Sequence, residues 1–473
     1  MVLHGRHVII TGTEEITAEN LLNVLNDALL WHGRNRSEII YLWNYYCGLQ
    51  PILERVKEVR PEICNTIVEN RAFEIVDFKT GFLFDEPIQY ISSRGESADN
   101  QALLQLNHYI ATDENEAENC DLADWFHICG TAFRSVMPHQ PDEENSAPFE
   151  LTTLNPMNTF VVYERKRKKP VLGVNYVTDD NGNVRYSCYT EHQYFEVFNT
   201  TLTVVQNHIL GGIPIIEYPL NMARIGAFEV VLPLLDAINL AESDRLDGVE
   251  QFVQSLLAFH NVDIDEEGAK ALRDLGIIKY RDVDNTMKGE VEFLNHELNQ
   301  TQTEVLVEHM YNTVLTICNM PNRNGGSSTS DTGKAVQMRD GWSSAKVAVK
   351  RTERIFKRSE RRMLKILLNI CRVIGDIDLQ ESEIGIRFTR ANYEDIQTKA
   401  QVLDLLLKNG KVHPSLAFEY SELFTDPATA YAISAKYYEE QQEKQQAQAR
   451  LQENSQAVES TQNKQDVKQT QNN

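Results

Sequence analysis

The stretch from Thr332 to Arg372 concentrates positive charge in a chain whose formal net charge is -23. Its cations are Lys334, Arg339, Lys346, Lys350, Arg351, Arg354, Lys357, Arg358, Arg361, Arg362, Lys365 and Arg372, and they face only the acids Asp340, Glu353 and Glu360. A cationic helix suits a polyanion such as DNA, whereas the acidic remainder suits a surface to which DNA does not adhere. The pattern therefore predicts contact with nucleic acid that is local and reversible.

A Gly/Ser/Thr-rich loop over residues 322–333 introduces this helix and ends in Gly333-Lys334, which invites comparison with a phosphate-binding loop. The Gly-x4-Gly-Lys spacing of such loops would need glycine where Ser328 stands, and Ala335 offers no hydroxyl to a magnesium ion. The stretch before the loop also has the pattern of a helix instead of a strand. We therefore expect no nucleotide site and no cofactor here.

The remaining polar motifs do not form a recognisable catalytic or metal site. The sequence has no His-Glu-x-x-His, Gly-x-Ser-x-Gly or Gly-x-Gly-x-x-Gly pattern. His108, His127 and His139 lie near acids, but dispersed histidines are more often structural than catalytic. The pairs Asp85-Glu86 and Asp113-Glu114 are typical of surface charges. Nothing specific in these motifs therefore supports an enzyme, catalytic residues or a metal site.

Composition indicates a globular protein of more than one domain. At 473 residues, with 42% hydrophobic and 24% charged residues, the chain can bury a core and hold two or three domains. No apolar run approaches the roughly 20 residues of a membrane span, and residues 1–10 do not resemble a signal peptide. The seven cysteines form no Cys-x-x-Cys pair, which favours buried free thiols in a reducing compartment.

Hydrophobic spacing predicts a helical N-terminal part followed by a β-rich part. Helices are expected over residues 15–70 with breaks at Pro51 and Pro61, over 65–81 and over 97–135, and an extended segment over 82–91. From Phe149 to Tyr218, β-branched runs and the turn Asp179–Gly182 predict strands and a hairpin. The cationic turn Glu164–Lys169 between two of these strands is either a DNA-contacting patch or a solvated hairpin.

Two long helices with a small module between them dominate the rest of the chain. The stretch from Phe228 to Phe259 has apolar residues at helical spacing and almost no breakers, which predicts a rod of roughly 48 Å. Thr301–Cys318 is helical again. The module between them should contain a helix at Glu266–Leu275 and strands at Gly276–Arg281 and Gly289–Leu294.

The C-terminal part is predicted to hold short elements and a polar tail. A strand is expected over residues 382–389 and helices over 393–410, 414–424 and 428–450. The last helix fades into a Gln-rich tail, which cannot bury enough apolar surface to fold alone.

Three stretches of the chain resemble the portal proteins of tailed bacteriophages, of the siphophage type. The first is Pro51–Arg55 with Asn70–Tyr90, where a helix carrying Val-Asp-Phe-Lys-Thr-Gly runs into Pro-Ile-Gln-Tyr. The second is Gly212–Tyr218 with Leu234–Arg245, which looks like the strand that enters the family's stem helix. The third is Asp331–Ala335, where relatives often carry Ser-Ser-Gly-x-Ala after the tunnel loop. The order of these parts makes the likeness more specific than any one motif.

The resemblance implies an α+β fold, mainly α, with long stem helices and a small α/β clip, assembled as a ring. The implied regions are a wing (1–226), a stem helix (227–260), a clip (261–298), a second stem helix (299–319), a tunnel loop (320–334), a long basic helix with a wing strand (335–394), a crown (395–440) and a disordered Gln-rich tail (441–473).

The resemblance also implies a function, and it implies a protein that is not an enzyme. Such proteins form a homo-oligomer, usually a dodecamer, at one capsid vertex of the virion, and they are assembled in the host cytoplasm. Double-stranded DNA passes through the ring during packaging and ejection. The implied partners are the terminase large subunit, a head–tail adaptor protein, the major capsid protein and scaffold, with no membrane. A ring-forming structural connector of the virion without DNA passage is the alternative.

Three groups of residues are candidates for this function. The tunnel-loop residues expected to meet DNA are Asn322, Arg323, Asn324, Gly325, Gly326, Lys334 and Arg339. The clip acids expected to dock a partner are Asp265, Glu266, Glu267, Asp282 and Asp284. The stem acids expected to face the lumen are Asp236, Glu242, Asp247 and Glu250, although such charges usually mark a solvated face. Lys350 to Arg362 face either DNA or the acids of a neighbouring subunit, and the loop is either a DNA grip or a surface linker.

Overall fold

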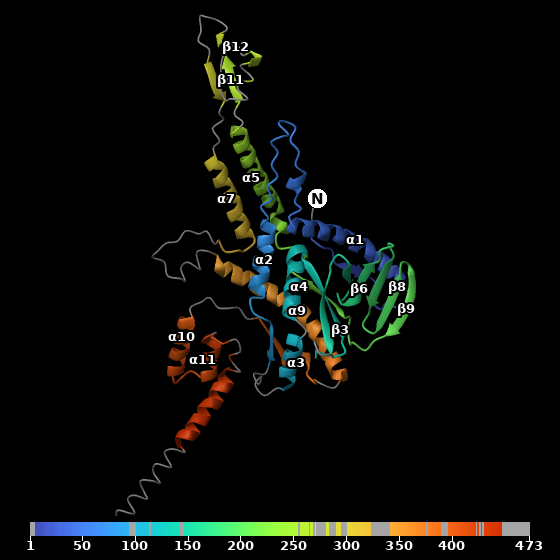
Figure 1. Ribbon diagram of the computed structural model, residues 1–473. Helices are drawn as coiled ribbons and strands as arrows, with labels where there is room; N and C mark the ends of the chain where they lie inside the picture. Colours follow the sequence, from blue (N-terminus) through green and yellow to red (C-terminus); the bar gives the residue numbers. More distant parts are fainter. Residues whose placement is uncertain are drawn as a thin grey trace, which may run out of the picture.

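The structure is a computed structural model with a mixed α/β body from which a pair of helices projects (Figure 1). It describes residues 5–93, 101–112, 115–141, 146–253, 256–263, 265–267, 270, 281–282, 290–294, 300–322, 341–374, 377–388, 396–421, 423–424, 427 and 430–446.

The N-terminal part contains strand β1 (Ile9–Thr11), helix α1 (Leu21–Tyr46), the short 3-10 helix η1 (Pro51–Glu54) and helix α2 (Arg71–Leu83). The predicted break at Pro51 is confirmed, but helix up to residue 70 is wrong, because residues 55–69 form neither helix nor strand. The side chain of Asn70 accepts a hydrogen bond from the N–H of Phe73 at 3.3 Å and so caps the start of α2.

The boundary between helix and strand near residue 130 differs from the prediction. Helices α3 (Gln101–Thr112) and α4 (Asn115–Cys129) are as expected, but the chain then enters strand β3 (Thr131–Pro138). Gly130 ends α4 at a φ of +80°. Strand β3 is paired on both sides, by β10 (Ile215–Pro219) and β4 (Phe149–Leu154), and this pairing overrides the local helical pattern.

A six-stranded sheet has the order β1-β5-β6-β7-β8-β9. Its remaining strands are β5 (Thr159–Glu164), β6 (Pro170–Thr178), β7 (Val184–Tyr189), β8 (Gln193–Phe198) and β9 (Thr201–Asn207). Strand β1 is parallel to β5, and the others form an antiparallel meander. Leu21 and Leu25 of α1 share a buried cluster with Phe160, Leu172 and Phe195 of the sheet, so α1 covers one sheet face. The predicted strands and the turn after Thr178 are confirmed.

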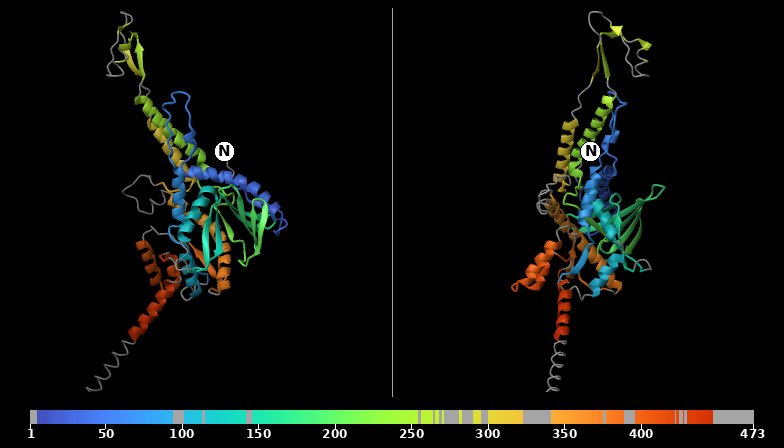
Figure 2. Two further views of the ribbon diagram at one scale, coloured as in Figure 1. Left: turned by 45° about the vertical axis from the view of Figure 1, so that its right-hand side comes forward. Right: turned by 60° about the vertical axis from the view of Figure 1, so that its left-hand side comes forward.

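Helices α5 (Leu232–Val253) and α7 (Gln300–Ile317) pack side by side and project from the body (Figures 1 and 2). A 3-10 turn, η3 (Glu229–Val231), precedes α5. The predicted helix from Phe228 to Phe259 is therefore too long, because strand β11 (Leu256–His260) pairs antiparallel with β14 (Glu290–Leu294). The apolar residues of β11 therefore belong to the small module at the tip of the projection and do not continue helix α5.

The tip module also contains the pair β12 (Val262–Asp263) and β13 (Arg281–Asp282). Strand β14 confirms the prediction for residues 289–294. The predicted helix over 266–275 and strand over 276–281 lie largely outside the described residues.

The long basic helix is α9 (Trp342–Ile374), and its apolar face lies in the largest core of the body. It is followed by the turn η4 (Glu381–Glu383) and strand β15 (Ile384–Arg387), which pairs with β2 (Gln89–Ser92). Helices α10 (Ile396–Lys408) and α11 (Pro414–Ser421) follow, and a helix spans residues 430–446. This last helix confirms the helix predicted over residues 428–450 as far as residue 446, and its Glu, Gln and Lys are good helix formers. The rest of the predicted Gln-rich tail lies outside the described residues.

Candidate functional site

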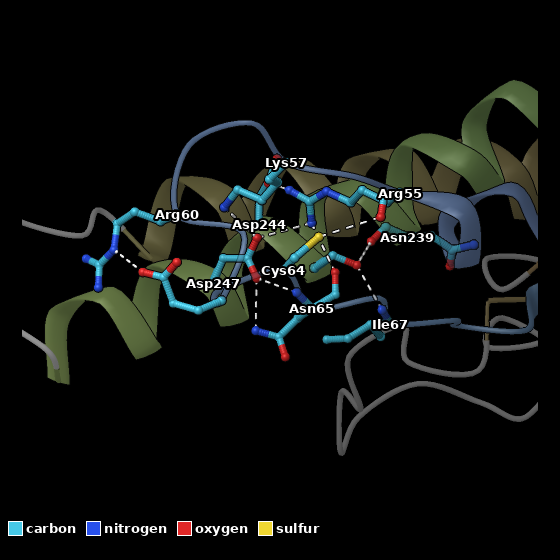
Figure 3. Close-up of polar contacts among 11 residues, drawn as sticks. Arg55, Lys57, Arg60, Cys64, Asn65, Ile67, Asn239, Asp244 and Asp247 are labelled. Carbon is cyan, nitrogen blue, oxygen red and sulfur yellow. Dashed lines mark hydrogen bonds and ion pairs between the residues drawn. The ribbon is translucent and has the colours of Figure 1, made fainter.

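A segment of residues 49–69, which we call the strap, lies along α5 and fixes it to the body (Figure 3). Backbone N–H groups of Asn65, Ile67 and Glu69 donate hydrogen bonds to side chains of α5 at 2.7, 2.9 and 2.8 Å. The acceptors are Asp247, Ser243 and Asn239, which recur every fourth residue. Alternate residues of an extended chain and successive turns of a helix repeat at similar distances, so one polar stripe can satisfy the strap's backbone.

Charges reinforce this attachment. Lys57 Nζ lies 2.9 Å from Asp247 Oδ2, and Arg55 lies 3.2 Å from the same oxygen while also contacting Asp244. The Asp247 side chain is 5% exposed, against 57% for Asp244. Burial opposes ionisation of Asp247, but hydrogen bonds from Asn65 and Lys57 outweigh it and keep its pKa below the ordinary value. Asp247 is therefore the charge around which the strap is organised.

The four acids predicted for the stem lumen have different surroundings. Asp247 is buried under the strap, so it is not part of a solvated acidic face, and the expectation of solvation is wrong for this residue. Asp236 accepts a hydrogen bond from Tyr45 of α1 at 2.8 Å, and burial raises its pKa. Glu242 and Glu250 are half-buried, and Arg245 links Glu242 to α7. Asp236 and Asp247 thus contact the N-terminal part of the chain, Asp236 through α1 and Asp247 through the strap.

The described acids of the set predicted for partner docking lie in or next to β12 and β13, at the end of the projection farthest from the body (Figure 1). Asp265, Glu266 and Glu267 are exposed, and Asp282 lies in β13, where it pairs with Val262. Asp284 lies outside the described residues. The structure therefore places three exposed carboxylates of the predicted set next to one another in the chain.

Most of the predicted DNA-contacting loop lies outside the described residues, namely Arg323, Asn324, Gly325, Gly326, Lys334 and Arg339. Asn322, at its start, donates a hydrogen bond to the side chain of Asn312 at 3.0 Å. The residues on either side are firmly packed: Met320 is buried, and the Trp342 ring lies 6.1 Å from both Phe78 and Phe82 of α2. A groove of about 480 Å³ adjoins this point between α2, α7 and α9.

The outer face of α9 carries a row of cations. Its exposed members are Lys350, Arg351, Arg354, Arg358, Arg361, Lys365 and Arg372. Arg361 lies 3.5 Å from Glu381 and Arg372 lies 3.4 Å from Asp378. The other five make no ion pair with another residue of the described part of the chain.

The cationic turn Glu164–Lys169 has acidic partners. Lys166 lies 2.5 Å from Glu14, and Glu164 accepts a hydrogen bond from the backbone N–H of Arg167 at 2.6 Å.

One acid of the basic stretch has a structural role that the sequence reading missed. Glu360 is fully buried and accepts hydrogen bonds from the hydroxyls of Tyr218, at 2.8 Å, and of Tyr90. These tyrosines lie on β10 and β2, so Glu360 joins α9 to two sheets. Its position four residues after Phe356 places it on the apolar stripe, and that spacing was the signal available in the sequence.

Two further properties concern the part of the chain that the structure describes. No group of three or more His, Cys, Asp or Glu side chains there is arranged to hold a metal ion. No helix within the same residues combines the length and apolar character needed to cross a bilayer.

Comparison with known proteins identifies the family. No curated protein matches the chain. Among solved structures, a chain from the neck of an empty GTA particle computed with C6 symmetry matches 74% of this chain and 90% of its own length, at 11% identity and a TM-score of 0.44. The model of the family described as phage portal protein, SPP1 Gp6-like, matches residues 30–457. The chain therefore belongs to the SPP1 Gp6-like family of phage portal proteins, as the resemblance of its motifs predicts.

Proposed function

We propose that this protein forms a ring-shaped channel at one vertex of a phage capsid and that double-stranded DNA passes through it during packaging and ejection. The family match over residues 30–457 carries this proposal. In the proposed ring, α5 and α7 form the stem around the channel, the module between them forms the clip, and the body forms the wing. The helices after residue 395 form the crown, and the protein acts without chemistry of its own.

Apolar side chains on the projecting helices support assembly into a ring. Leu240, Leu246 and Val249 of α5 and Val305 and Leu306 of α7 are exposed in a single chain. Exposed apolar surface of this kind usually marks a contact with another protein. A ring of copies, each using the same two surfaces, would bury these residues throughout. Twelve copies are the number that the family resemblance favours.

Charge supports passage of DNA rather than its retention. Each phosphate contact adds affinity, so a channel lined with cations would hold DNA instead of releasing it. The chain as a whole carries a net charge of -23, and Glu242 and Glu250 of α5 remain candidates for the lumen. The loop over residues 322–333 and the cations just after it are proposed to contact DNA transiently. This balance would allow a duplex to slide with little resistance.

The tip of the projection is the proposed docking site for other proteins. Its exposed acids Glu266 and Glu267 would complement a basic surface on the terminase large subunit and later on a head–tail adaptor. The variant Glu266→Lys/Glu267→Lys should bind terminase more weakly while it still forms rings. The matched control is Glu15→Lys/Glu19→Lys, which reverses two exposed acids of the body. Equal terminase binding by both variants would remove the tip from consideration.

The body is the proposed contact for the major capsid protein and scaffold.

The decisive experiment for the whole proposal is electron microscopy of the purified particle viewed along its symmetry axis. A closed ring with an opening wide enough for a DNA duplex is the expected result. A ring without such an opening would favour the structural connector, and a chain that never assembles in the presence of capsid protein and scaffold would refute both.

A further inference from the structure

The strap exposes four large apolar side chains, which we call its apolar edge. Leu49, Leu53, Val56 and Val59 are all exposed, with Val56 at 85% and Val59 at 76% of their full accessible surface. Four large apolar side chains within eleven residues are not needed for the strap to hold α5, because that attachment is polar. Such a patch on a surface segment is typical of a contact with another protein.

The strap holds this edge in a fixed position. Val56 lies between Arg55 and Lys57, and both neighbours are paired with Asp247 of α5. The backbone beyond Val59 is tied to α5 by the hydrogen bonds of Asn65, Ile67 and Glu69. Little conformational freedom would be lost when the edge meets a partner, and this favours binding.

A second apolar surface lies on the other flank of α5. Helix α7 exposes Val305 and Leu306 there, while its opposite face packs on α5. Figures 1 and 2 show α5 between the strap and α7. The two flanks are joined to the same turn of α5, because Asp244 contacts Arg55 of the strap and its neighbour Arg245 lies 4.0 Å from Glu304 of α7. Val56 and Val305 thus stand at about the same level along α5.

We propose that the apolar edge of the strap, Leu49 to Val59, packs against Val305 and Leu306 of α7 in a neighbouring copy of this chain. The proposal rests on the proposed ring and names the contact that would close it. A second copy is the partner because each chain offers both surfaces at one level on opposite flanks of α5. Two different surfaces joined head to tail generate a closed ring when the rotation between copies closes.

The test uses two variants that each change one surface. Variant X carries Val56→Lys/Val59→Lys on the strap, and variant Y carries Val305→Glu/Leu306→Glu on α7. Each alone should assemble with an association constant at least about tenfold below that of the wild type, because charge meets an apolar surface. An equimolar mixture should recover assembly, because alternating copies pair Lys with Glu at one contact and two unchanged surfaces at the next.

Mass photometry and analytical ultracentrifugation report the assembly state. The matched control is Val177→Lys/Ile209→Lys, which adds the same charges at exposed apolar sites on β6 and just after β9 and should assemble normally. Recovery in the mixture also proves that both variants fold. The milder Val56→Ser/Val59→Ser should show the same defect in smaller degree.

Three outcomes would overturn the proposal in distinguishable ways. Wild-type assembly by X alone would exclude the strap from the interface while leaving the ring intact. The pairing of the strap with α7 would be refuted if X and Y both assemble poorly, both have the circular dichroism of the wild type, and mixing them does not restore assembly. A wild-type chain that stays monomeric with capsid protein and scaffold would refute the proposed ring itself, and the strap contact with it.

Discussion

Asn65 donates two hydrogen bonds to Oδ1 of Asp247, one from its backbone nitrogen at 2.7 Å and one from its side-chain amide at 2.9 Å. The two residues are 182 positions apart in the sequence, yet this contact joins the N-terminal strap to α5. The other carboxylate oxygen of Asp247 receives Arg55 and Lys57. One buried carboxylate therefore receives four of the donors that hold the strap against the helix.

Replacing Asp247 by alanine should release the strap. The change removes the acceptor of Lys57 and of both Asn65 donors and leaves Arg55 its ion pair with Asp244. Removing one partner of a buried ion pair costs on the order of 3 kcal/mol. Trypsin can report the release, because Arg55, Lys57 and Arg60 all lie in the strap. Cleavage there should be roughly 100-fold faster than in the wild type in the same oligomeric state.

The neighbouring variant Asp244→Ala is the matched control for this prediction. Asp244 contacts Arg55 from an exposed position, and such pairs contribute less than about 1 kcal/mol. Cleavage should therefore change by less than about fivefold. Equal effects of the two variants would show that the strap is not organised around Asp247.

His32 should make stability depend on pH. Its Nε2 lies 3.1 Å from the carbonyl oxygen of Met157 and 3.3 Å from the Tyr176 hydroxyl, and burial lowers its pKa to about 4. Histidine in an unfolded chain has a pKa of about 6.5. Between these values the unfolded state binds a proton that the folded state does not, so the free energy of unfolding falls as pH falls, by up to about 1.4 kcal/mol per pH unit.

Urea unfolding of the wild type and of His32→Gln at pH 7 and pH 5 isolates this contribution. At pH 7 the folded wild type is unprotonated at His32 and the unfolded chain is mostly so. At pH 5 the wild type should have lost roughly 2 kcal/mol more than the variant, which has no group to titrate there. A difference between the two proteins that does not change with pH would show that His32 is protonated equally in both states.

The sequence predicts elements best where one local pattern determines them. The meander from β5 to β9 follows from β-branched runs and the turn after Thr178, and α9 follows from its apolar stripe. The strap could not be predicted, because its backbone is satisfied by Asn239, Ser243 and Asp247 far along the chain. Their spacing of four residues was visible, but a polar helix stripe usually faces water.

Two boundaries illustrate different limits. The change from α5 to β11 occurs inside an apolar run, Leu256–Phe259, and short apolar runs fit either a helix or a strand. The pairing of β11 with β14 determines the outcome, and this information is non-local. The change from α4 to β3 was readable in principle, because Gly130 is the residue type that ends helices. For the candidate site, the tip acids could be grouped from sequence, whereas the burial of Asp247 could not.

Glu360 should be among the most sensitive polar residues of the body. It accepts the hydroxyls of Tyr90 and Tyr218, and burial together with its carboxyl group raises the pKa of Tyr218 well above the ordinary value. Glu360→Ala would create a cavity and leave two buried hydroxyls without an acceptor. The free energy of unfolding should fall by about 3–5 kcal/mol. Glu360→Gln keeps the shape and one acceptor and should cost about 1 kcal/mol.

Chemical denaturation of the two Glu360 variants and of Tyr218→Phe gives the measurement. The double variant Glu360→Ala/Tyr218→Phe should be more stable than additivity predicts, because the second change removes a stranded hydroxyl. Purely additive losses would mean that the carboxyl and the phenol do not interact.

Gly130 and Gly182 share a φ of +80° but differ in their surroundings, and this makes them a matched pair. A Cβ at Gly130 would lie 2.1 Å from the carbonyl oxygen of Arg224, whereas a Cβ at Gly182 would meet nothing within 4 Å. Gly182→Ala should cost only the backbone strain of about 1 kcal/mol. Gly130→Ala adds a clash with backbone that cannot rotate away, so its cost should exceed about 3 kcal/mol. Urea midpoints and the soluble yield of the two variants measure the difference, and similar losses would show that the chain near Arg224 can move to admit a methyl group.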